Sequence, residues 1–160
     1  MEKRKFNQAA YDAFDMQNKL RLIEIIESNS DYKLFGNINV ERYKMGDVLF
    51  KNKKKTVLFE NETRADFEKI VLNYNSIHIP LRKQNTPANF YIVWKIDLCQ
   101  FILINKKTLN KYKNNIVNVK CNYNQNQEYA HDEDFIDIPK EETQWYVIGE
   151  NLKLIKLSYE

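Results

Sequence analysis

Apolar and polar positions along this chain follow two different periods, which predicts a fold that mixes helices and strands. Between Phe6 and about Glu27, apolar side chains recur every three or four positions, as expected of an amphipathic helix that covers another part of the fold. The residues of this predicted apolar face are Ala9, Ala13, Met16, Leu20 and Ile23. From residue 32 onward, β-branched and aromatic runs between polar turns dominate, and such runs are typical of strands.

A β-hairpin is predicted in the first half of the chain. The apolar runs at 46–50 and 55–62 are separated by the lysine-rich sequence KNKKK, whose like charges favour a solvated turn between two strands. The preceding residues 32–43 are expected to be extended around a turn at Gly36 and Asn37. Strands are therefore expected directly after the first helix.

The rest of the chain predicts further elements of both types. Residues 63–75 suit a helix, because Thr63 can act as N-cap and apolar residues then recur at helical spacing. The other expected elements are a strand at 76–80, a hairpin about Leu98, a helical turn at 108–112, strands at 116–121 and 143–148, and a last strand or short helix from residue 151. The segment between the strands at 116–121 and 143–148 is polar and then acidic, so we expect a loop there.

Length, charge and cysteine content narrow the class of protein. A chain of 160 residues is long enough for a real core, so we expect a single α/β domain over residues 1–160. There are 25 Lys and Arg against 22 Asp and Glu, and this net charge of +3 permits a nucleic-acid partner without requiring one. No apolar run has the length of a signal peptide or a membrane span, so we expect a cytoplasmic protein with no membrane partner. Cys99 and Cys121 lack the spacing of a zinc site, and Cys99 is expected in the core.

Three acidic residues give the strongest chemical signal in the sequence. Successive strand side chains alternate between faces, so Glu60 and Glu62 point the same way. If the hairpin turn has an even number of residues, Lys51 pairs with Thr56 and the ladder brings Asp47 opposite Glu60. Carboxylates at roughly 4.5 to 5.5 Å between Cβ atoms repel each other, and a divalent cation such as Mg²⁺ would offset that repulsion. Asp47, Glu60 and Glu62 are therefore the candidate metal-binding and catalytic residues.

The same acids have a second interpretation. A turn with an odd number of residues would offset the pairing, and all three acids would then lie at a solvated strand end. In that case Lys53 to Lys55 and Arg64 would balance their charge without any metal ion. Spacing alone leaves both interpretations open.

The stretch from about residue 46 to 75 resembles the core of the PD-(D/E)XK nuclease superfamily. That core has Asp on the first strand of a hairpin, (D/E)-X-Lys at the end of the second strand, and then a helix; here GDVLF and VLFENETR have Asp47 and Glu60 in the two acidic positions. Gly46 stands where the motif has proline, and Glu62 stands where lysine is expected. Some type II restriction endonucleases similar to this pattern also carry Glu-X-Glu. The resemblance implies a restriction-endonuclease-like mixed β-sheet with flanking helices.

The resemblance also implies roles for individual residues. Asp47 and Glu60 would hold Mg²⁺, which polarises the scissile phosphate and lowers the pKa of a bound water molecule. Glu62 would be a third ligand or would orient the attacking water. The positive charge of the missing lysine would come from elsewhere, and Arg82 and Lys83 are candidates to contact the phosphate of the substrate.

These expectations define a first function and a rival. The first is a Mg²⁺-dependent DNA endonuclease, with phage and bacterial proteins among similar members, and a homodimer is expected because each chain has one site and a duplex has two strands. The rival is a module that keeps the hairpin scaffold, lacks catalysis and binds nucleic acid or protein. Glu62 in place of lysine favours the rival. The sequence has no Ser-His-Asp or Cys-His arrangement with a recognisable turn and no Gly-rich phosphate loop.

Overall fold

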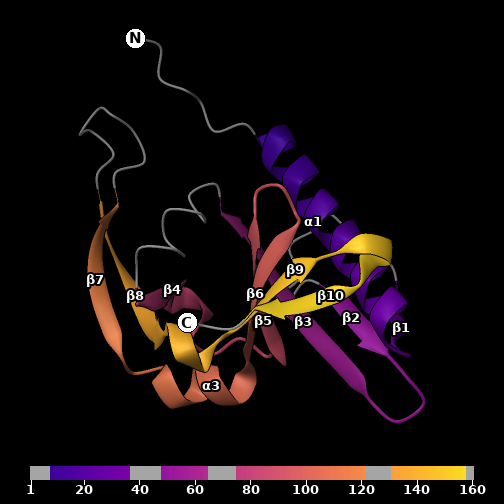
Figure 1. Cartoon of the computed structure of the whole chain (residues 1–160). Coiled ribbons are helices and arrows are strands. Elements are labelled where there is room, and N and C mark those ends of the chain that lie inside the picture. The colour runs from indigo at the N-terminus through magenta and orange to yellow at the C-terminus, as the bar shows by residue number, and fades with distance from the viewer. Residues whose placement is uncertain (1–7, 37–47, 65–74, 122–130, 158–160) are drawn as a thin grey trace.

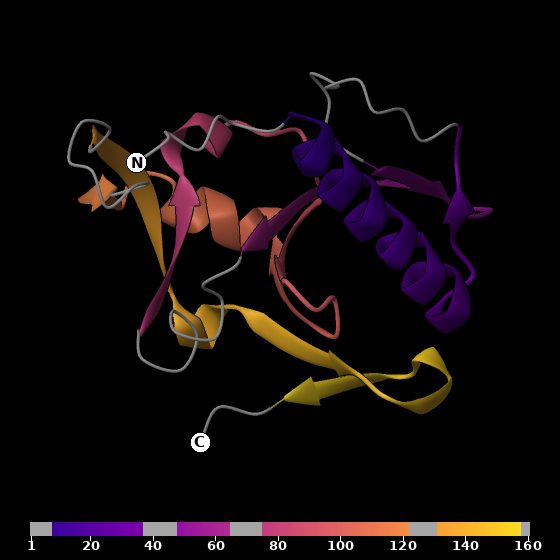
Figure 2. The same ribbon diagram turned by 90° about the horizontal axis from the view of Figure 1, so that it is seen from above.

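Helices and strands are arranged as in Figures 1 and 2, which show a computed structural model that describes residues 8–36, 48–64, 75–121 and 131–157. The helices are α1 (Gln8–Asn29) and α3 (Lys106–Tyr112), and the short 3-10 turns are η1 (Leu81–Lys83), η3 (Lys140–Glu142) and η4 (Glu150–Leu152). The strands are β1 (Lys33–Leu34), β2 (Val48–Lys51), β3 (Thr56–Arg64), β4 (Ser76–Pro80), β5 (Phe90–Lys95), β6 (Gln100–Asn105), β7 (Ile116–Cys121), β8 (His131–Pro139), β9 (Gln144–Ile148) and β10 (Leu154–Leu157). The described residues form a single domain of mixed α/β class, as predicted.

Two β-sheets organise the domain. The larger sheet has seven strands in the order β1-β2-β3-β5-β6-β9-β10, and the smaller has three in the order β4-β8-β7. Every pairing is antiparallel except that of β3 with β5, which run parallel. A parallel pair needs a crossover connection, and here the chain passes through β4 and η1 of the smaller sheet before it returns as β5.

The larger sheet lies between two layers. On one face, Leu22 and Ile25 of α1 are fully buried in a core with Phe50, Phe59 and Trp94. The opposite face packs against the smaller sheet and α3, in a second core that contains Ile77, Ile79, Tyr91, Val93, Ile102, Ile104, Leu109, Ile136, Ile138 and Trp145. Each fully buried aliphatic side chain contributes about 1.5 to 3 kcal/mol, so both faces of the central strands are held by apolar burial.

The larger sheet curls, and the C-terminal end of α1 contacts both of its edges (Figure 2). At one edge, the backbone N–H of Leu34 in β1 donates to the Glu27 carboxylate at 3.0 Å. At the other edge, the Asn29 amide donates to the carbonyl of Leu152 at 2.7 Å and accepts from the N–H of Leu154 at 3.3 Å. One helix end thus fixes β1 and β10, the first and last strands of the sheet.

The register of the central hairpin agrees with the even turn considered above. Lys51 pairs with Thr56, and Phe50 pairs with Val57. The described ladder extends to the pair of Val48 with Phe59. The strands at 76–80 and 116–121, the hairpin about Leu98 and the helical turn are confirmed as well, and the tail is a strand.

Four expectations were wrong in detail. The predicted face of α1 included Leu20, which is 53% exposed; its C-terminal half is apolar on several sides, so periodicity does not select one face. Thr63 belongs to β3, which continues to Arg64, and the helix expected at 63–75 lies largely outside the described residues. Half of the predicted acidic loop is the nine-residue strand β8, and Cys99 is exposed in the turn after β5.

None of the described helices is long and apolar enough to cross a membrane.

Candidate functional site

Glu60 and Glu62 lie on the same face of β3, as strand alternation predicted. Their neighbours Val57 and Phe59 pack on the opposite face, in the core that contains α1. On β5, the residue paired with Glu60 is Tyr91, which belongs to the core beneath the smaller sheet. The two acids therefore point into the layer between the sheets and not toward solvent at a strand end.

Glu60 is a buried carboxylate with a lysine beside it. Its residue exposure is 6%, and one carboxylate oxygen forms an ion pair and hydrogen bond with the Lys83 ammonium. The other oxygen accepts a hydrogen bond from the Thr86 hydroxyl at 2.9 Å. Lys83 ends η1 and Thr86 lies in the loop before β5, so both partners come from the crossover that joins β4 to β5. A buried carboxylate needs such partners, because an isolated charge in the interior is strongly unfavourable.

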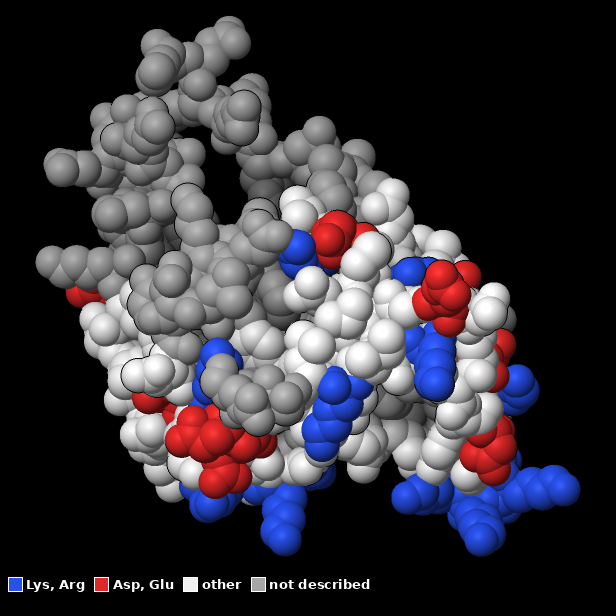
Figure 3. All heavy atoms as spheres, viewed as in Figure 1, with Lys and Arg blue, Asp and Glu red and all other residues white. Residues whose placement is uncertain are grey.

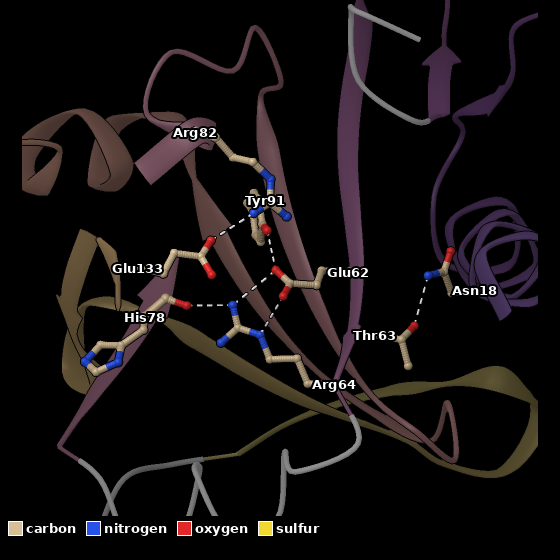
Figure 4. A network of polar contacts seen from close by, with 8 residues as sticks. All are labelled: Asn18, Glu62, Thr63, Arg64, His78, Arg82, Tyr91 and Glu133. Carbon is tan, nitrogen blue, oxygen red and sulfur yellow. Dashed lines mark hydrogen bonds and ion pairs between the residues drawn. The ribbon is translucent and has the colours of Figure 1, made fainter. Parts of the chain in front are cut away.

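Glu62 has a different set of partners, drawn in Figure 4. The guanidinium of Arg64 donates twice to its carboxylate, from Nε at 2.8 Å and from Nη2 at 3.1 Å. The Tyr91 hydroxyl donates to the same carboxylate. Burial alone raises the pKa of Glu62, but the charge and hydrogen bonds of Arg64, together with the Tyr91 hydroxyl, outweigh it and hold the pKa below the usual 4.5. Glu62 is therefore ionised at neutral pH.

Tyr91 is held as a neutral hydrogen-bond donor. Burial and the adjacent charge of Glu62 raise the pKa of its hydroxyl well above the usual 10.0. The phenol thus keeps its proton wherever the protein is folded near neutral pH, and that proton satisfies Glu62.

Arg64 also connects the two sheets. Its Nη2 atom donates to the backbone carbonyl of His78 in β4 at 2.6 Å, in addition to its bonds with Glu62 (Figure 4). The side chain of Arg64 is 12% exposed, so these bonds are made largely away from water. The turn η1, which carries Lys83, follows directly after β4 in the chain. Because Arg64 holds β4 through His78, it also fixes the segment from which Lys83 reaches Glu60.

Arg82 lies at the rim of this cluster. Its side chain is 69% exposed, and it donates to the carboxylate of Glu133 in β8 at 3.0 Å. In β4, the Nε2 atom of His78 is 3.0 Å from Oδ1 of Asp137, and its ring packs on Phe135. Arg82 and Lys83, which the sequence grouped together, therefore have different surroundings: only Lys83 contacts one of the predicted acids.

The opposite face of β3 carries a second polar group, against α1. The Asn18 amide donates to the Thr63 hydroxyl at 2.9 Å, and the Trp94 indole N–H donates to the Asn61 side chain at 3.2 Å. Lys19, the next residue of α1, is also buried. These contacts fix α1 against the end of β3, behind the acids.

The described residues supply part of a metal site and no complete one. Asp47, the predicted first ligand, lies outside the described residues. Within residues 8–36, 48–64, 75–121 and 131–157, no group of three or more His, Cys, Asp or Glu side chains is arranged to hold a metal ion. Glu60 fits the role of a ligand, since it is a buried carboxylate whose lysine partner is 32% exposed. Partners engage both oxygens of each acid, but Glu62 fits the role less well, because its basic partner Arg64 is only 12% exposed and donates to it twice.

Sequence reasoning missed three members of this cluster. Arg64 was assigned only to charge balance, although strand alternation directs it to the same face as Glu62. Thr86 and Tyr91 carried no local signal, because they meet the acids through the parallel pairing of β3 with β5. Thr86 and Tyr91 reach the acids because the chain comes back beside β3 as β5, and no pattern in residues 86–91 predicts this pairing.

Comparisons with known proteins add no family assignment. No protein-family model matches the chain, and searches of curated proteins and of solved structures found no match either. The fold is mixed α/β with a curled seven-stranded sheet, and the cluster between its sheets defines the site.

Proposed function

We propose that this protein is a metal-dependent phosphodiesterase that cleaves DNA. The observation that carries the proposal is the pairing of Lys83 with the buried carboxylate of Glu60. Glu60 occupies the (D/E) position of the nuclease-like motif, whose lysine is absent from β3. Lys83 supplies a positive charge beside this acid from a different segment of the chain, which is the source that the sequence led us to expect.

The order of the elements also supports the proposal. The resemblance implies a leading helix, an antiparallel hairpin that carries the acids, a helix and then a further strand. The described chain has α1, the hairpin of β2 and β3, and then β4, whereas the helix expected between β3 and β4 lies largely outside the described residues. The even register of β2 with β3 is the one from which the opposition of Asp47 and Glu60 was deduced.

In this proposal each side chain has a limited task. Asp47 and Glu60 would hold Mg²⁺, which when bound would polarise the phosphate and lower the pKa of a water molecule. Lys83 places a positive charge next to Glu60, where it stabilises negative charge that develops on a substrate phosphate. Thr86 orients the Glu60 carboxylate through its hydrogen bond. Glu62, with Arg64 and Tyr91, holds β3 and β4 in register and is not assigned as a ligand.

Plasmid cleavage tests this proposal directly. The wild-type chain is expected to nick or cleave plasmid DNA with Mg²⁺ and to be inactive with EDTA. Glu60→Gln and Lys83→Met should each lower the rate by about 100-fold or more, the usual cost of losing one group that stabilises the transition state. Glu141→Gln, an exposed acid in η3, is the control and should cleave like the wild type. Mg²⁺-dependent cleavage that survives Glu60→Gln at the wild-type rate would refute the assignment.

A second function is a binding module without catalysis. It is favoured by one observation: Glu60 and Glu62 each already have a basic partner, Lys83 and Arg64. The two functions differ in their response to Mg²⁺. A metal ligand at Glu60 makes the melting temperature rise with Mg²⁺ concentration, and Glu60→Gln removes that rise. A binding module shows the same melting temperature with Mg²⁺ and with EDTA.

A further inference from the structure

Two groups of exposed lysines lie on either side of the loop that reaches Glu60. The first, here called the tip group, is Lys53, Lys54 and Lys55 in the turn between β2 and β3. The second, the helix group, is Lys106 and Lys107 in the first turn of α3. Among the residues that the structure describes, none of these five ammonium groups has an ion-pair partner. Their charge is therefore available to a partner molecule.

One residue joins the elements that carry the two groups. Asn89 exchanges backbone and side-chain bonds with Leu58 of β3: its N–H donates to the Leu58 carbonyl at 2.8 Å, and its side-chain oxygen accepts from the Leu58 N–H at 2.8 Å. Its own carbonyl accepts from the N–H of Lys106 at 2.9 Å. The beginning of α3 and the beginning of β3 are thus fixed to the same point.

The loop of residues 84–89 runs from the end of α3 to the junction at Asn89. At one end, the Gln84 side chain donates to the carbonyl of Lys113, just after α3, at 2.7 Å. At the other end is Asn89, and between them Thr86 donates to Glu60. The loop that holds Glu60 and follows Lys83 therefore ends where the elements that carry the two lysine groups meet.

Both lysine groups are held in defined positions. In the tip, the Asn52 side chain accepts from the N–H groups of Lys54 and Lys55, both at 2.9 Å, which fixes the turn. In α3, the Asn105 side chain caps the helix by accepting from the N–H of Thr108 at 2.8 Å. Figure 3 shows basic side chains gathered at two places along the lower edge of the molecule, over the β2–β3 turn and over α3.

The charge at the far end of α3 is already balanced. Lys111 forms an ion pair with Glu142 at 3.1 Å, and an acidic group adjoins α3 on this face (Figure 3). Within α3 itself, the two lysines without an ion-pair partner, Lys106 and Lys107, lie in the first turn, beside Asn89.

We infer that the tip group and the helix group form a phosphate-contacting track that lays the backbone of DNA across loop 84–89, next to Glu60. Lysine ammonium groups bind phosphate as point charges and carry no base preference, so the track positions the DNA without reading its sequence. Two cationic groups fixed at separate points suit an extended polyanion better than a small phosphate ligand. The inference deepens the proposed function, since it assigns the surface by which the substrate reaches the proposed site.

Salt-dependent binding tests this track without any cleavage. The full chain is titrated against labelled duplex and single-stranded DNA in EDTA over a series of salt concentrations. Lys53→Gln/Lys54→Gln/Lys55→Gln should lower the slope of log affinity against log salt by about 2 to 3, and Lys106→Gln/Lys107→Gln by about 1 to 2. The charge-matched control changes two exposed lysines at the far edge of the sheet, Lys153→Gln/Lys156→Gln, and should leave the slope unchanged. The two DNA forms show whether duplex or single strand uses these contacts.

Failure of the track and failure of the proposed function give different results. If both lysine variants bind DNA with the affinity and salt slope of the control variant, the track is refuted, even if Glu60→Gln abolishes cleavage. If the lysine variants lose slope as expected while the wild type shows no Mg²⁺-dependent cleavage, the track stands and the proposed nuclease activity falls. Circular dichroism and melting temperature of each variant exclude misfolding as the cause of a loss.

Discussion

Replacing Arg64 by methionine tests the central polar cluster through its stability. The substitution keeps most of the apolar stem but removes both bonds to Glu62 and the bond to the His78 carbonyl. Glu62 is then left with the Tyr91 hydroxyl alone. Removing one partner of a buried ion pair costs about 3 to 5 kcal/mol, because the remaining charge is uncompensated.

The exposure of the pair places the expected loss near the lower end of that range. The side chain of Arg64 is 12% exposed and that of Glu62 is 28% exposed, so water partly solvates the orphaned carboxylate. We expect Arg64→Met to lower the free energy of unfolding by about 3 kcal/mol at about pH 7. For a chain of this length the loss corresponds to a fall in melting temperature of about 6 to 12 °C.

The loss should depend on pH in a defined direction. Arg64 holds the pKa of Glu62 below 4.5, so the stability contributed by this carboxylate is fully present above about pH 4.5 and is lost as the pH falls through the lowered pKa. In Arg64→Met that contribution is absent. The difference in unfolding free energy between wild type and variant should therefore be largest near neutral pH and should shrink toward about pH 3.

Urea unfolding at several pH values, followed by tryptophan fluorescence, measures this difference, since Trp94 and Trp145 are both buried. The matched control is Arg82→Met, which removes an arginine that also pairs with a glutamate at 3.0 Å but is 69% exposed. It should cost less than about 1 kcal/mol. A loss from Arg64→Met equal to that of Arg82→Met, or one that does not change with pH, would refute the assignment of Arg64 as the clamp between the sheets.

Two further predictions concern the packing of the fold. Ile79→Ala leaves a cavity at a fully buried position between the two sheets and should lower the free energy of unfolding by about 3 kcal/mol, measured by urea denaturation. The control Ile96→Ala, at a position that is 47% exposed, should change it by less than about 1 kcal/mol. Equal losses in the two variants would contradict the described core. Because Cys99 is exposed, native protein should react rapidly with a thiol reagent such as DTNB, and Cys99→Ser should lower the number of rapidly reacting thiols by one; an unreactive native wild type would contradict its exposure.

The strand β8 shows where composition misled the prediction. Its sequence HDEDFIDIP is rich in acids, which favoured a loop, yet Ile136 and Ile138 are fully buried. Asp132 and Asp134 lie on the same face of the strand as Ile136 and Ile138, but in its first half, where that face is exposed. A strand can leave one end in solvent and bury the other, so the density of acids at one end does not separate a strand from a loop.

The sequence by itself determined the local features of this protein. Backbone geometry fixes the alternation of strand side chains, and so the common face of Glu60 and Glu62 could be deduced from their spacing. The lysine-rich turn was enough to predict the β2–β3 hairpin, and its register was one of two that could be named in advance. The roles of Lys83 and Arg82 as substrate contacts, and of Asp47 as a ligand, stay predictions.

Only the tertiary structure decided which partners the two acids have. Lys83 and Thr86 meet Glu60, and Tyr91 meets Glu62, because the chain crosses through β4 and returns as β5 parallel to β3. Such pairings depend on where distant segments close on one another and on which side chains are removed from water together. The local pattern of apolar and polar residues contains no information on which distant segments meet or which side chains are buried together. Strand spacing therefore predicted two acids on one face but not the basic residues and hydroxyls that surround them.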